Sequence, residues 1–446
     1  MYVCGPTVYD VPHLGHGRFT LVFDVLRRYL EFTGVRVRYV SNITDIDDRI
    51  IERARTEGRT EAEVASEFET SWWAAMDALG VLRPVESPHA TDWVAEMVGL
   101  VSELIDRGSA YVSDDGVYLS VDEIEGYGLL ARQSLSSLRT GARVEVDENK
   151  RSPLDFAVWK KAKPGEPSWD APFGRGRPGW HTECVVMSLG LLGDGFDLHG
   201  GGLDLAFPHH ENERAQAVAL GRAFAQHWTH NGFVEVDGEK MSKSLGNFTS
   251  LIDLLERSDS RAYRLLVLRS HYRSPIEITP STIADAEAAL ARLDNLARRF
   301  GLGALTGADP GSNPGIITKE SAIEAGADPD ALAAFAQRME DDLDTPAAVA
   351  AIFDLAKDAN ASADKGDTQT GHRLAVTAAA MCAALGLELR AGTDVEPDAD
   401  IRDLVSEREA ARAAGDFARA DALRDEITGR GWILKDRPDG SRLHRE

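Results

Sequence analysis

The beginning of the chain alternates short β-branched stretches with amphipathic segments. Residues 1–3 form an expected short strand, and a helix is expected from about Gly15, where apolar positions recur three and four residues apart. Residues 35–40 alternate between apolar and polar as a second strand, and another helix is expected from about Ile46. Strands that alternate with helices predict a parallel sheet with helices on its faces.

The pattern changes twice before residue 260. Residues 60–110 are helical in pattern, whereas 110–165 are turn-rich with short strands, which we interpret as an insertion. The strand pattern resumes over 180–192 and 196–198, and a helix is expected near Pro208.

Residues beyond 260 show the 3.6-residue period of helices that pack on helices. A stretch rich in Gly, Pro, Asn and Asp marks a linker at 301–329, and a second linker covers 391–400. A helix pair turning at Gly415 and a short hairpin end the chain. The predicted class is therefore α/β, with a Rossmann-like parallel-sheet domain, a helical bundle and a small C-terminal module, over residues 1–260, 261–390 and 401–446.

The composition narrows the class of protein. The 446 residues are 43% hydrophobic and 27% charged, which is typical of soluble globular proteins. No apolar run approaches the roughly 20 residues that span a bilayer, and no signal-peptide pattern begins the chain. The three cysteines, Cys4, Cys184 and Cys382, are too few for a disulfide scaffold. We predict a cytoplasmic protein without a membrane partner, whose thiols serve packing or metal binding.

The charge is acidic overall but unevenly spread. A net charge of −24 argues against a protein that holds nucleic acid by bulk positive charge. Residues 301–400 contain 18 acidic and 6 basic residues, whereas 401–446 contain 10 of each. The acidity is therefore concentrated in residues 301–400 and spares the C-terminal module, so the net charge does not exclude a local nucleic-acid contact there, although it predicts weak nonspecific binding.

The string His13-Leu14-Gly15-His16 follows the first strand and opens a helix. Unpaired N–H groups at a helix N-terminus attract anions, and glycine permits close approach of a phosphate or a flat ring. Taken alone, such a string is usually a pair of surface histidines.

The string Lys240-Met241-Ser242-Lys243-Ser244 forms a cationic, hydroxyl-bearing loop suited to a polyphosphate. The ordinary alternative is a solvated loop.

Four separated residues make a candidate metal set. His209 and Glu213 are four positions apart, so on a helix they project from one face. With Cys4 and Cys184 they would supply two thiolates, an imidazole and a carboxylate, which suits zinc. His210 is the main rival ligand, because three residues from Glu213 also fits one helical face.

The H-x-G-H and K-M-S-K-S strings together resemble the signature of class I aminoacyl-tRNA synthetases. Within that class the chain is similar to the cysteinyl-tRNA synthetase family from residue 1 to its end. Further motifs carry this resemblance, at residues 4–10, 42–48, 179–184, 199–204, 207–213 and 341–346. The resemblance leads us to expect a further segment ahead of the cysteine motif, and this sequence begins after that point.

The resemblance implies ATP-dependent activation of L-cysteine as an adenylate and its transfer to tRNA(Cys). It implies one Zn²⁺ per chain that selects the substrate thiolate over serine, held by Cys4, Cys184, His209 and Glu213. It implies catalytic roles for His13, His16, Lys240 and Lys243. Gly15 and Ser242 would join these four in binding ATP with its Mg²⁺. The residues expected at the cysteine substrate are Gly5, Thr7 and Trp180.

The C-terminal module would read the anticodon, and we expect a monomer. The expected contacts are Arg430, Trp432, Lys435, Arg437 and Arg442, although Trp432 would equally suit a hydrophobic contact between hairpin and helices. Two alternatives stay open. One is the related cysteine ligase of mycothiol biosynthesis, which needs no anticodon reader. The other is a non-catalytic tRNA-binding paralogue, which would be expected to lose one of the motif residues.

Overall fold

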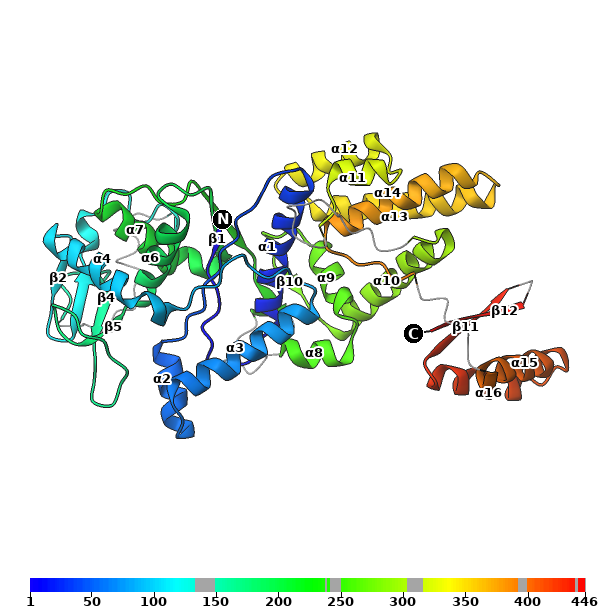
Figure 1. Ribbon diagram of the computed structural model, residues 1–446, viewed down its shortest axis with the longest axis horizontal. Helices are drawn as coiled ribbons and strands as arrows, with labels where there is room; N and C mark the ends of the chain where they lie inside the picture. The colour runs from blue at the N-terminus through cyan, green and yellow to red at the C-terminus, as the bar shows by residue number, and fades with distance from the viewer. Residues whose placement is uncertain are drawn as a thin grey trace.

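The computed structural model describes residues 1–132, 149–236, 239–240, 250–302, 316–391, 399–437 and 440–445. The sheet domain lies at one end of an elongated molecule, the helical bundle follows, and the C-terminal module lies at the other end (Figure 1). Within these ranges, no helix combines the length and the apolar character needed to cross a membrane.

A parallel sheet forms the centre of the first domain, as predicted. Its strands are β1 (Tyr2–Val3), β6 (Leu198–Gly202) and β7 (His227–Asn231), in the order β1-β6-β7. Tyr2 also forms a parallel bridge to Val40, so the sheet continues beyond β1. Parallel strands end at one edge of a sheet, which is where open α/β sheets bind ligands.

Helices accompany the sheet along the chain, but two local predictions for this domain were wrong. These helices are α1 (Leu14–Phe32), α2 (Asp48–Glu57), α3 (Glu61–Ala78), α4 (Val94–Asp106), α6 (Trp180–Leu192) and α7 (Glu211–Ala219), and α1 packs against β6. Residues 35–39 form no strand, and only Val40 pairs with the sheet. Residues 180–192 form helix α6 rather than a strand. All residues from 182 to 189 are buried, and a helix buried on every side lacks the periodicity that separates it from a buried strand.

The insertion is a separate antiparallel sheet in the order β2-β3-β4-β5. Its strands are β2 (Ala110–Val112), β3 (Gly116–Leu119), β4 (Phe156–Lys161) and β5 (Gly176–Pro178), so it extends beyond the expected boundary at residue 165. Lys160 on β4 and Arg177 on β5 both form ion pairs with Asp48, the first residue of α2. These contacts attach the insertion to the helix layer.

A small three-stranded sheet follows the parallel one. Strand β8 (Val234–Val236) pairs with β9 (Glu239–Lys240) and, in parallel, with β10 (Ile276–Glu277). Two helices, α8 (Leu251–Arg257) and α9 (Ser260–Leu268), connect β9 to β10 along the chain.

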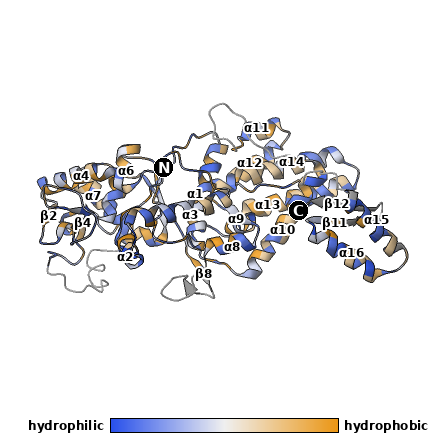
Figure 2. Cartoon of the chain, turned by 60° about the horizontal axis from the view of Figure 1, so that its bottom comes forward, coloured by the Kyte–Doolittle hydropathy of each residue, from blue (hydrophilic) through white to orange (hydrophobic). Residues whose placement is uncertain are grey.

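The helical bundle shares one hydrophobic core with α1. Its helices are α10 (Pro280–Phe300), α11 (Lys319–Glu324), α12 (Pro329–Glu340), α13 (Thr345–Asp364) and α14 (Thr368–Ala384). Phe32 of α1 packs edge-on against Phe335 of α12, with ring centroids 6.0 Å apart. The hydrophobic residues of α12, α13 and α14 lie where these helices pack together (Figure 2). This core fixes α1 against the bundle.

The C-terminal module has its own small core. Helices α15 (Ala399–Ala413) and α16 (Phe417–Gly429) pack with the antiparallel strands β11 (Trp432–Arg437) and β12 (Gly440–Arg445). The turn between the helices has a positive φ at Gly415, as predicted. Ile401, Ile427, Trp432 and Leu434 form the core.

Candidate active site

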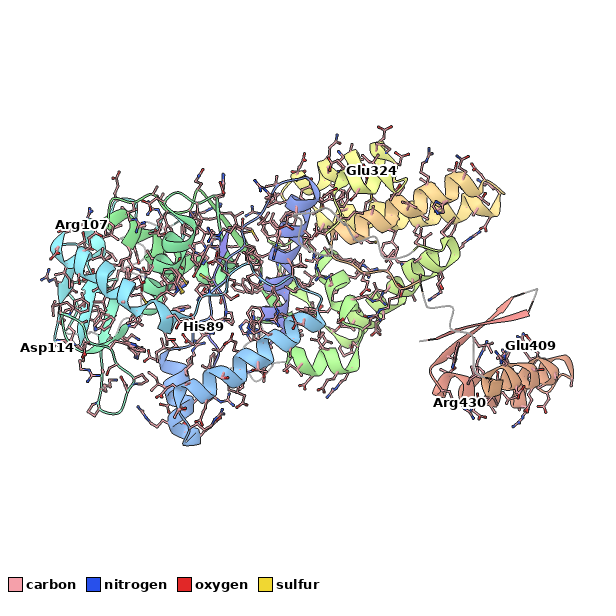
Figure 3. All side chains as sticks on the ribbon, in the orientation of Figure 1. His89, Arg107, Asp114, Glu324, Glu409 and Arg430 are labelled. Atoms are coloured by element: carbon pink, nitrogen blue, oxygen red, sulfur yellow. The ribbon has the colours of Figure 1, made fainter. Side chains whose placement is uncertain are left out.

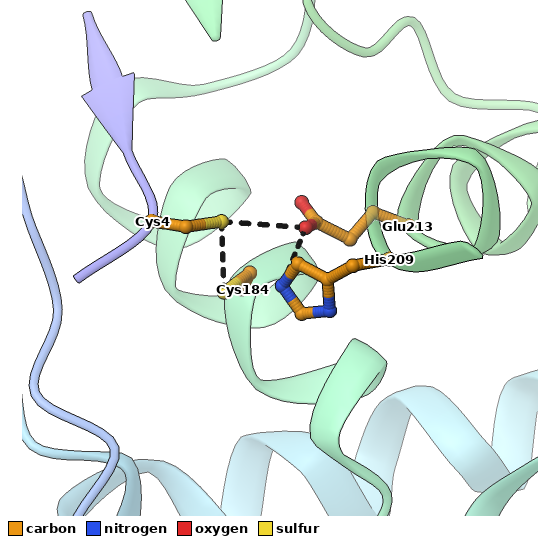
Figure 4. A group of neighbouring side chains, drawn as sticks. All are labelled: Cys4, Cys184, His209 and Glu213. Carbon is orange, nitrogen blue, oxygen red and sulfur yellow. Dashed lines mark hydrogen bonds and ion pairs between the residues drawn. The ribbon is translucent and has the colours of Figure 1, made fainter. Parts of the chain in front are cut away.

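Cys4, Cys184, His209 and Glu213 meet at the carboxyl end of β1 (Figure 4). Cys4 follows β1, Cys184 lies on α6, and His209 and Glu213 lie just before and on α7. All four side chains are buried, and one ligand atom from each lies within 4.8 Å of the others. The sequence-predicted metal set is therefore brought together in space.

The spacing of these atoms fits a tetrahedral metal ion. Zinc bond lengths imply about 3.8 Å between two ligand sulfurs and about 3.5 Å between a sulfur and an oxygen. The Sγ atoms of Cys4 and Cys184 lie 3.6 Å apart, and Cys4 Sγ lies 3.5 Å from Glu213 Oε1. His209 Nε2 lies 2.9 Å from Glu213 Oε1 and is buried without a hydrogen-bond partner. An imidazole paired with a carboxylate that also faces the Cys4 thiol suits a shared cation.

A second group shares two of the same ligands. Cys4 and Glu213 also lie within reach of His199 and His210. His210 Nε2 lies 3.4 Å from Cys4 Sγ, and His199 Nε2 lies 2.7 Å from Glu213 Oε2. The competition between His209 and His210 that the sequence leaves open is thus present in the structure.

Other histidines orient these two rings. His209 Nδ1 lies 2.8 Å from His181 Nδ1, and His210 Nδ1 lies 2.8 Å from His230 Nε2. Each ring therefore uses Nδ1 on another histidine and presents Nε2 to Cys4 or Glu213, an arrangement that fixes ligand orientation. We assigned no role to His181, His199 or His230 from the sequence. A signal was available, because six of the chain's twelve histidines fall between residues 181 and 230.

Burial and mutual contact set the charges of the group. Burial raises the pKa of the Cys4 thiol well above its ordinary value. Burial also opposes ionisation of Cys184, but contacts with Cys4 and His209 outweigh it and lower the pKa of Cys184 to about 6. Burial opposes a charge on His209, yet Glu213 raises the pKa of His209 to about 10. A dication would supply the positive charge that this imidazolium otherwise provides, with release of protons.

The Asn42 side chain connects the parts of this group. Its Oδ1 accepts hydrogen bonds from Tyr2 Oη at 3.0 Å and from Gly5 N at 2.9 Å. Cys184 Sγ lies 3.8 Å from the same oxygen, and Nδ2 donates to Thr44 Oγ1 at 3.1 Å. Asn42 lies within the motif at residues 42–48, to which we assigned no individual role from the sequence. Asn42 fixes the main chain beside Cys4.

Gly5 and Thr7, both predicted at the substrate, lie in the loop that follows Cys4. A Cβ atom on Gly5 would lie 1.6 Å from the Asn42 carbonyl oxygen, so this close approach requires glycine. Thr7 forms a parallel bridge to Thr44.

Trp180, the third predicted substrate residue, begins α6. Its ring stacks on His209 at a centroid distance of 3.9 Å and stays 37% exposed. It therefore covers one side of the candidate metal group while keeping a surface open to solvent.

The two histidines of the H-x-G-H string form a reciprocal cap on α1. His16 N donates to His13 Nδ1 at 3.2 Å, and His13 N donates to His16 Nδ1 at 3.3 Å. The rings stack 3.7 Å apart. Burial and the neighbouring His13 hold the pKa of His16 well below its ordinary value. A neutral ring that accepts at Nδ1 carries its proton at Nε2, so this cap leaves His16 with an N–H donor at Nε2. Gly15 lies between them in the first turn.

The K-M-S-K-S string is only partly described. The main chain of Lys240 ends β9. Its side chain, and the predicted residues Ser242 and Lys243, lie outside the described residues.

The predicted anticodon residues divide into three groups. Arg430 is exposed and pairs with Asp400 and Glu426, on the outer surface of the module (Figure 3). Trp432 is only 5% exposed, so its ring packs in the module core and offers no open stacking face there. This burial favours the packing role for Trp432. The side chains of Lys435, Arg437 and Arg442 lie outside the described part of the chain.

Comparison with known proteins defines the class first. The family described as tRNA synthetases class I (C) catalytic domain matches residues 1–288. A DALR domain matches residues 334–390, and a cysteinyl-tRNA ligase anticodon binding domain matches residues 394–442. Two solved structures share the fold. Methionyl-tRNA synthetase of Mycobacterium tuberculosis, in complex with methionyl-adenylate, has TM-score 0.60 and 17% identity over 86% of this chain and 89% of that chain. A leucyl-tRNA synthetase of Agrobacterium radiobacter, in a ternary complex with tRNA, has TM-score 0.61 and 13% identity over 86% and 84%. The fold is that of a class I aminoacyl-tRNA synthetase.

The sequences of relatives then specify the family. A cysteine–tRNA ligase of Methylobacillus flagellatus is 45% identical over 100% of this chain and 94% of its own length. One of Chromobacterium violaceum is 45% identical over 99% and 94%. The chain belongs to the cysteine–tRNA ligase family.

Proposed function

We propose that the chain joins L-cysteine to tRNA(Cys) at the expense of ATP, through a cysteinyl-adenylate. The observation that carries this proposal is the buried Cys4, Cys184, His209 and Glu213 group beside the loop that leads to His13. The family match over the full chain supports the substrates. In the proposed reaction the cysteine carboxylate attacks the α-phosphorus of ATP and pyrophosphate leaves. A ribose hydroxyl of the terminal adenosine of the tRNA then attacks the acyl carbon and AMP leaves.

No protein nucleophile is required, because this chemistry depends on position and charge stabilisation. The N-terminus of α1 would bind the phosphates, through the main-chain N–H groups of its first turn that the His13–His16 cap does not use and through the Nε2–H of His16. A neutral His16 donates a hydrogen bond without a second positive charge. Lys240 and Lys243 would contribute charge to the pyrophosphate with Mg²⁺, which stays a prediction from the sequence.

The buried group would hold Zn²⁺, since its donor set and spacing fit that ion. When bound, Zn²⁺ favours a thiolate over a hydroxyl and lowers the pKa of a thiol, which separates cysteine from serine. Among the chain's own residues, His181 and Glu213 orient His209, and Asn42 fixes the main chain at Cys4. Trp180 covers one side of His209 and is itself partly exposed to solvent. His210 is the alternative imidazole ligand.

The C-terminal module would contact the anticodon of tRNA(Cys). The match of an anticodon binding domain to residues 394–442 supports this role. It also favours tRNA over an amino sugar as the acceptor, because a mycothiol-type ligase has no use for that domain. The residues that contact RNA, the domain boundaries, the monomeric state and the cytoplasmic location stay predictions.

Two matched cysteine variants test the proposal. Cys184→Ala should lose bound zinc and cysteine-dependent ATP–pyrophosphate exchange together. Cys382→Ala is the control, because Cys382 is also fully buried but lies on α14 in the bundle. The control should keep both properties. Full exchange by zinc-free Cys184→Ala would contradict the proposal.

A further inference from the structure

Arg18 is a buried cation that the proposed reaction leaves unexplained. It lies on α1, two residues after His16, and is only 1% exposed. Among the described residues it forms no ion pair, and its Nε has no hydrogen-bond partner. Burial lowers the pKa of Arg18 to about 10, against the opposing influence of Tyr263 and Glu235, so it stays charged at neutral pH. A buried charge without a carboxylate partner is costly and persists where other contacts compensate.

Main-chain carbonyls supply that compensation. The terminal nitrogens of Arg18 donate to four carbonyl oxygens, at 2.6 Å to Phe233, 3.2 Å to Tyr272 and 3.4 Å to His271, and also to Ser274. Phe233 directly precedes β8, and the other three residues form the turn that leads to β10. Arg18 therefore contacts the main chain just before each strand of the parallel pair β8–β10.

The two chain segments meet closely at this point. Gly232 N donates to the Tyr272 carbonyl at 2.7 Å. A Cβ atom on Gly232 would lie 2.6 Å from the carbonyl oxygens of Arg273 and Ser274, so the approach depends on glycine. A planar guanidinium with several fixed N–H directions can bind several carbonyls at once, which a lysine ammonium at the same place cannot reproduce.

The two elements that Arg18 connects carry the two signature strings. Helix α1 begins at the H-x-G-H string, and β8 leads through β9 into the K-M-S-K-S string along the sequence. We propose that Arg18 is a positioning residue that fixes the position of β8 relative to α1. It thereby places the H-x-G-H and K-M-S-K-S strings relative to each other, so that both can bind the same ATP molecule. This inference rests on the proposed function.

A second contact holds the same turn from the bundle. Tyr272 Oη donates to Asp342 Oδ1 at 2.7 Å, and Arg273 donates to both Asp342 oxygens at 2.6 and 2.7 Å. Asp342 and Leu343 both have φ of +55°, which non-glycine residues rarely adopt. Such strain persists where surrounding contacts require it. The turn that leads to β10 is therefore held both by α1 and by the segment between α12 and α13.

A matched pair of buried arginines tests the inference. Arg18→Lys keeps the positive charge but cannot form hydrogen bonds to all four main-chain carbonyl oxygens. Arg27→Lys is the control, because Arg27 is also 1% exposed on α1 but contacts Glu31 and the Arg83 carbonyl. The readouts are KM for ATP and KM for cysteine in ATP–pyrophosphate exchange, with zinc content and Tm.

Arg18→Lys should raise KM for ATP by about tenfold or more, because small displacements of binding groups have large effects. In Arg18→Lys, KM for cysteine and the zinc content should stay within about twofold of the values for the unmodified chain. In Arg27→Lys, both KM values and the zinc content should stay within the same limit. Equal effects of the two variants on KM for ATP would overturn the inference. So would an Arg18→Lys variant that lowers Tm but leaves KM for ATP unchanged.

If Arg18→Lys does not fold, a second pair of variants, Asp342→Asn and Asp341→Asn, tests the same inference. Asp342→Asn should raise KM for ATP by about two- to fivefold, since its contacts are partly exposed. The exposed neighbour Asp341→Asn should not. Unchanged KM for ATP in Asp342→Asn would overturn the inference. Absence of cysteine-dependent exchange in the unmodified chain would instead contradict the proposed function itself.

Discussion

Replacement of Asp24 by Asn should strongly destabilise the joint between α1 and the bundle. The Asp24 side chain is fully buried and accepts from Arg28 Nε at 2.9 Å, Arg264 at 2.6 Å and Leu82 N at 2.9 Å. Arg264 also donates to the carbonyls of Leu79, Gly80 and Leu385. One carboxylate thus neutralises two buried guanidiniums where α1, α3, α9 and α14 meet.

The loss in free energy of unfolding follows from the two guanidinium charges that Asp24→Asn leaves without a carboxylate partner. Removing one member of a buried pair costs about 3–5 kcal/mol, because the remaining charge stays desolvated. With about 2.1 cal/mol/K of unfolding entropy per residue, a loss of about 4 kcal/mol lowers Tm by about 4 °C if all 446 residues unfold together. A smaller unfolding unit gives a larger shift.

Thermal unfolding of Asp24→Asn beside Asp77→Asn provides the assay. Asp77 pairs with Arg83 at the surface, where both side chains are about half exposed, so its loss should cost less than about 1 kcal/mol. Burial opposes ionisation of Asp24, but Arg28 and Arg264 outweigh it and lower the pKa of Asp24. Ionised Asp24 therefore adds to the free energy of unfolding above its unfolded-state pKa of about 3.9. This stabilisation is lost as the pH falls through the lower pKa of Asp24 in the folded state. Equal Tm values for the two variants would refute the reasoning.

Three further outcomes are expected. Asn42→Ala should weaken zinc binding by about 10- to 100-fold in competition with a chelator, since Asn42 fixes the main chain at Cys4; unchanged affinity would contradict that role. Burial opposes a charge on His89, but Glu69 at 2.9 Å raises the pKa of His89. The pair of His89 with Glu69 should add under about 1 kcal/mol to the free energy of unfolding. This stabilisation should be fully present below about pH 6.5 and lost as the pH rises through the pKa of His89 in the folded state. If the unfolding midpoint of Glu69→Gln depends on pH in the same way as that of the unmodified chain, this role of the His89–Glu69 pair is contradicted. Trp432→Ala should cost the C-terminal module about 3–5 kcal/mol and abolish tRNA charging while exchange persists; intact charging would disprove the packing role.

The features that the sequence predicts best are those set by neighbouring residues. The helix after His13 was predictable because apolar positions recur three and four residues apart along it, whereas its reciprocal histidine cap is seen only in the structure. The four-residue spacing placed His209 and Glu213 on one helical face, although His210 fitted a helical face with Glu213 as well. Cys4 and Cys184 were added to this pair for their thiol chemistry, and the family resemblance then implied the same four residues. No local pattern records that the four meet in space, because this depends on the folded sheet domain.

Other features depend on tertiary structure that no local pattern records. Helix α6 was predicted as a strand because nearly every side is buried. The two imidazole choices, His209 and His210, stay equivalent in spacing, and the structure adds a second histidine behind each. Trp432 could equally have stacked on RNA or packed, and only the folded module shows its burial.

The central claim is that this chain charges tRNA(Cys) with cysteine by holding the substrate thiol at the buried Cys4–Glu213 group. The most direct test is charging of purified tRNA(Cys) with cysteine and with serine, with zinc measured on the same protein. We predict charging with cysteine but not with serine, loss of charging when zinc is removed, and recovery when zinc is restored. Equal charging with serine, or full charging by zinc-free protein, would contradict the account.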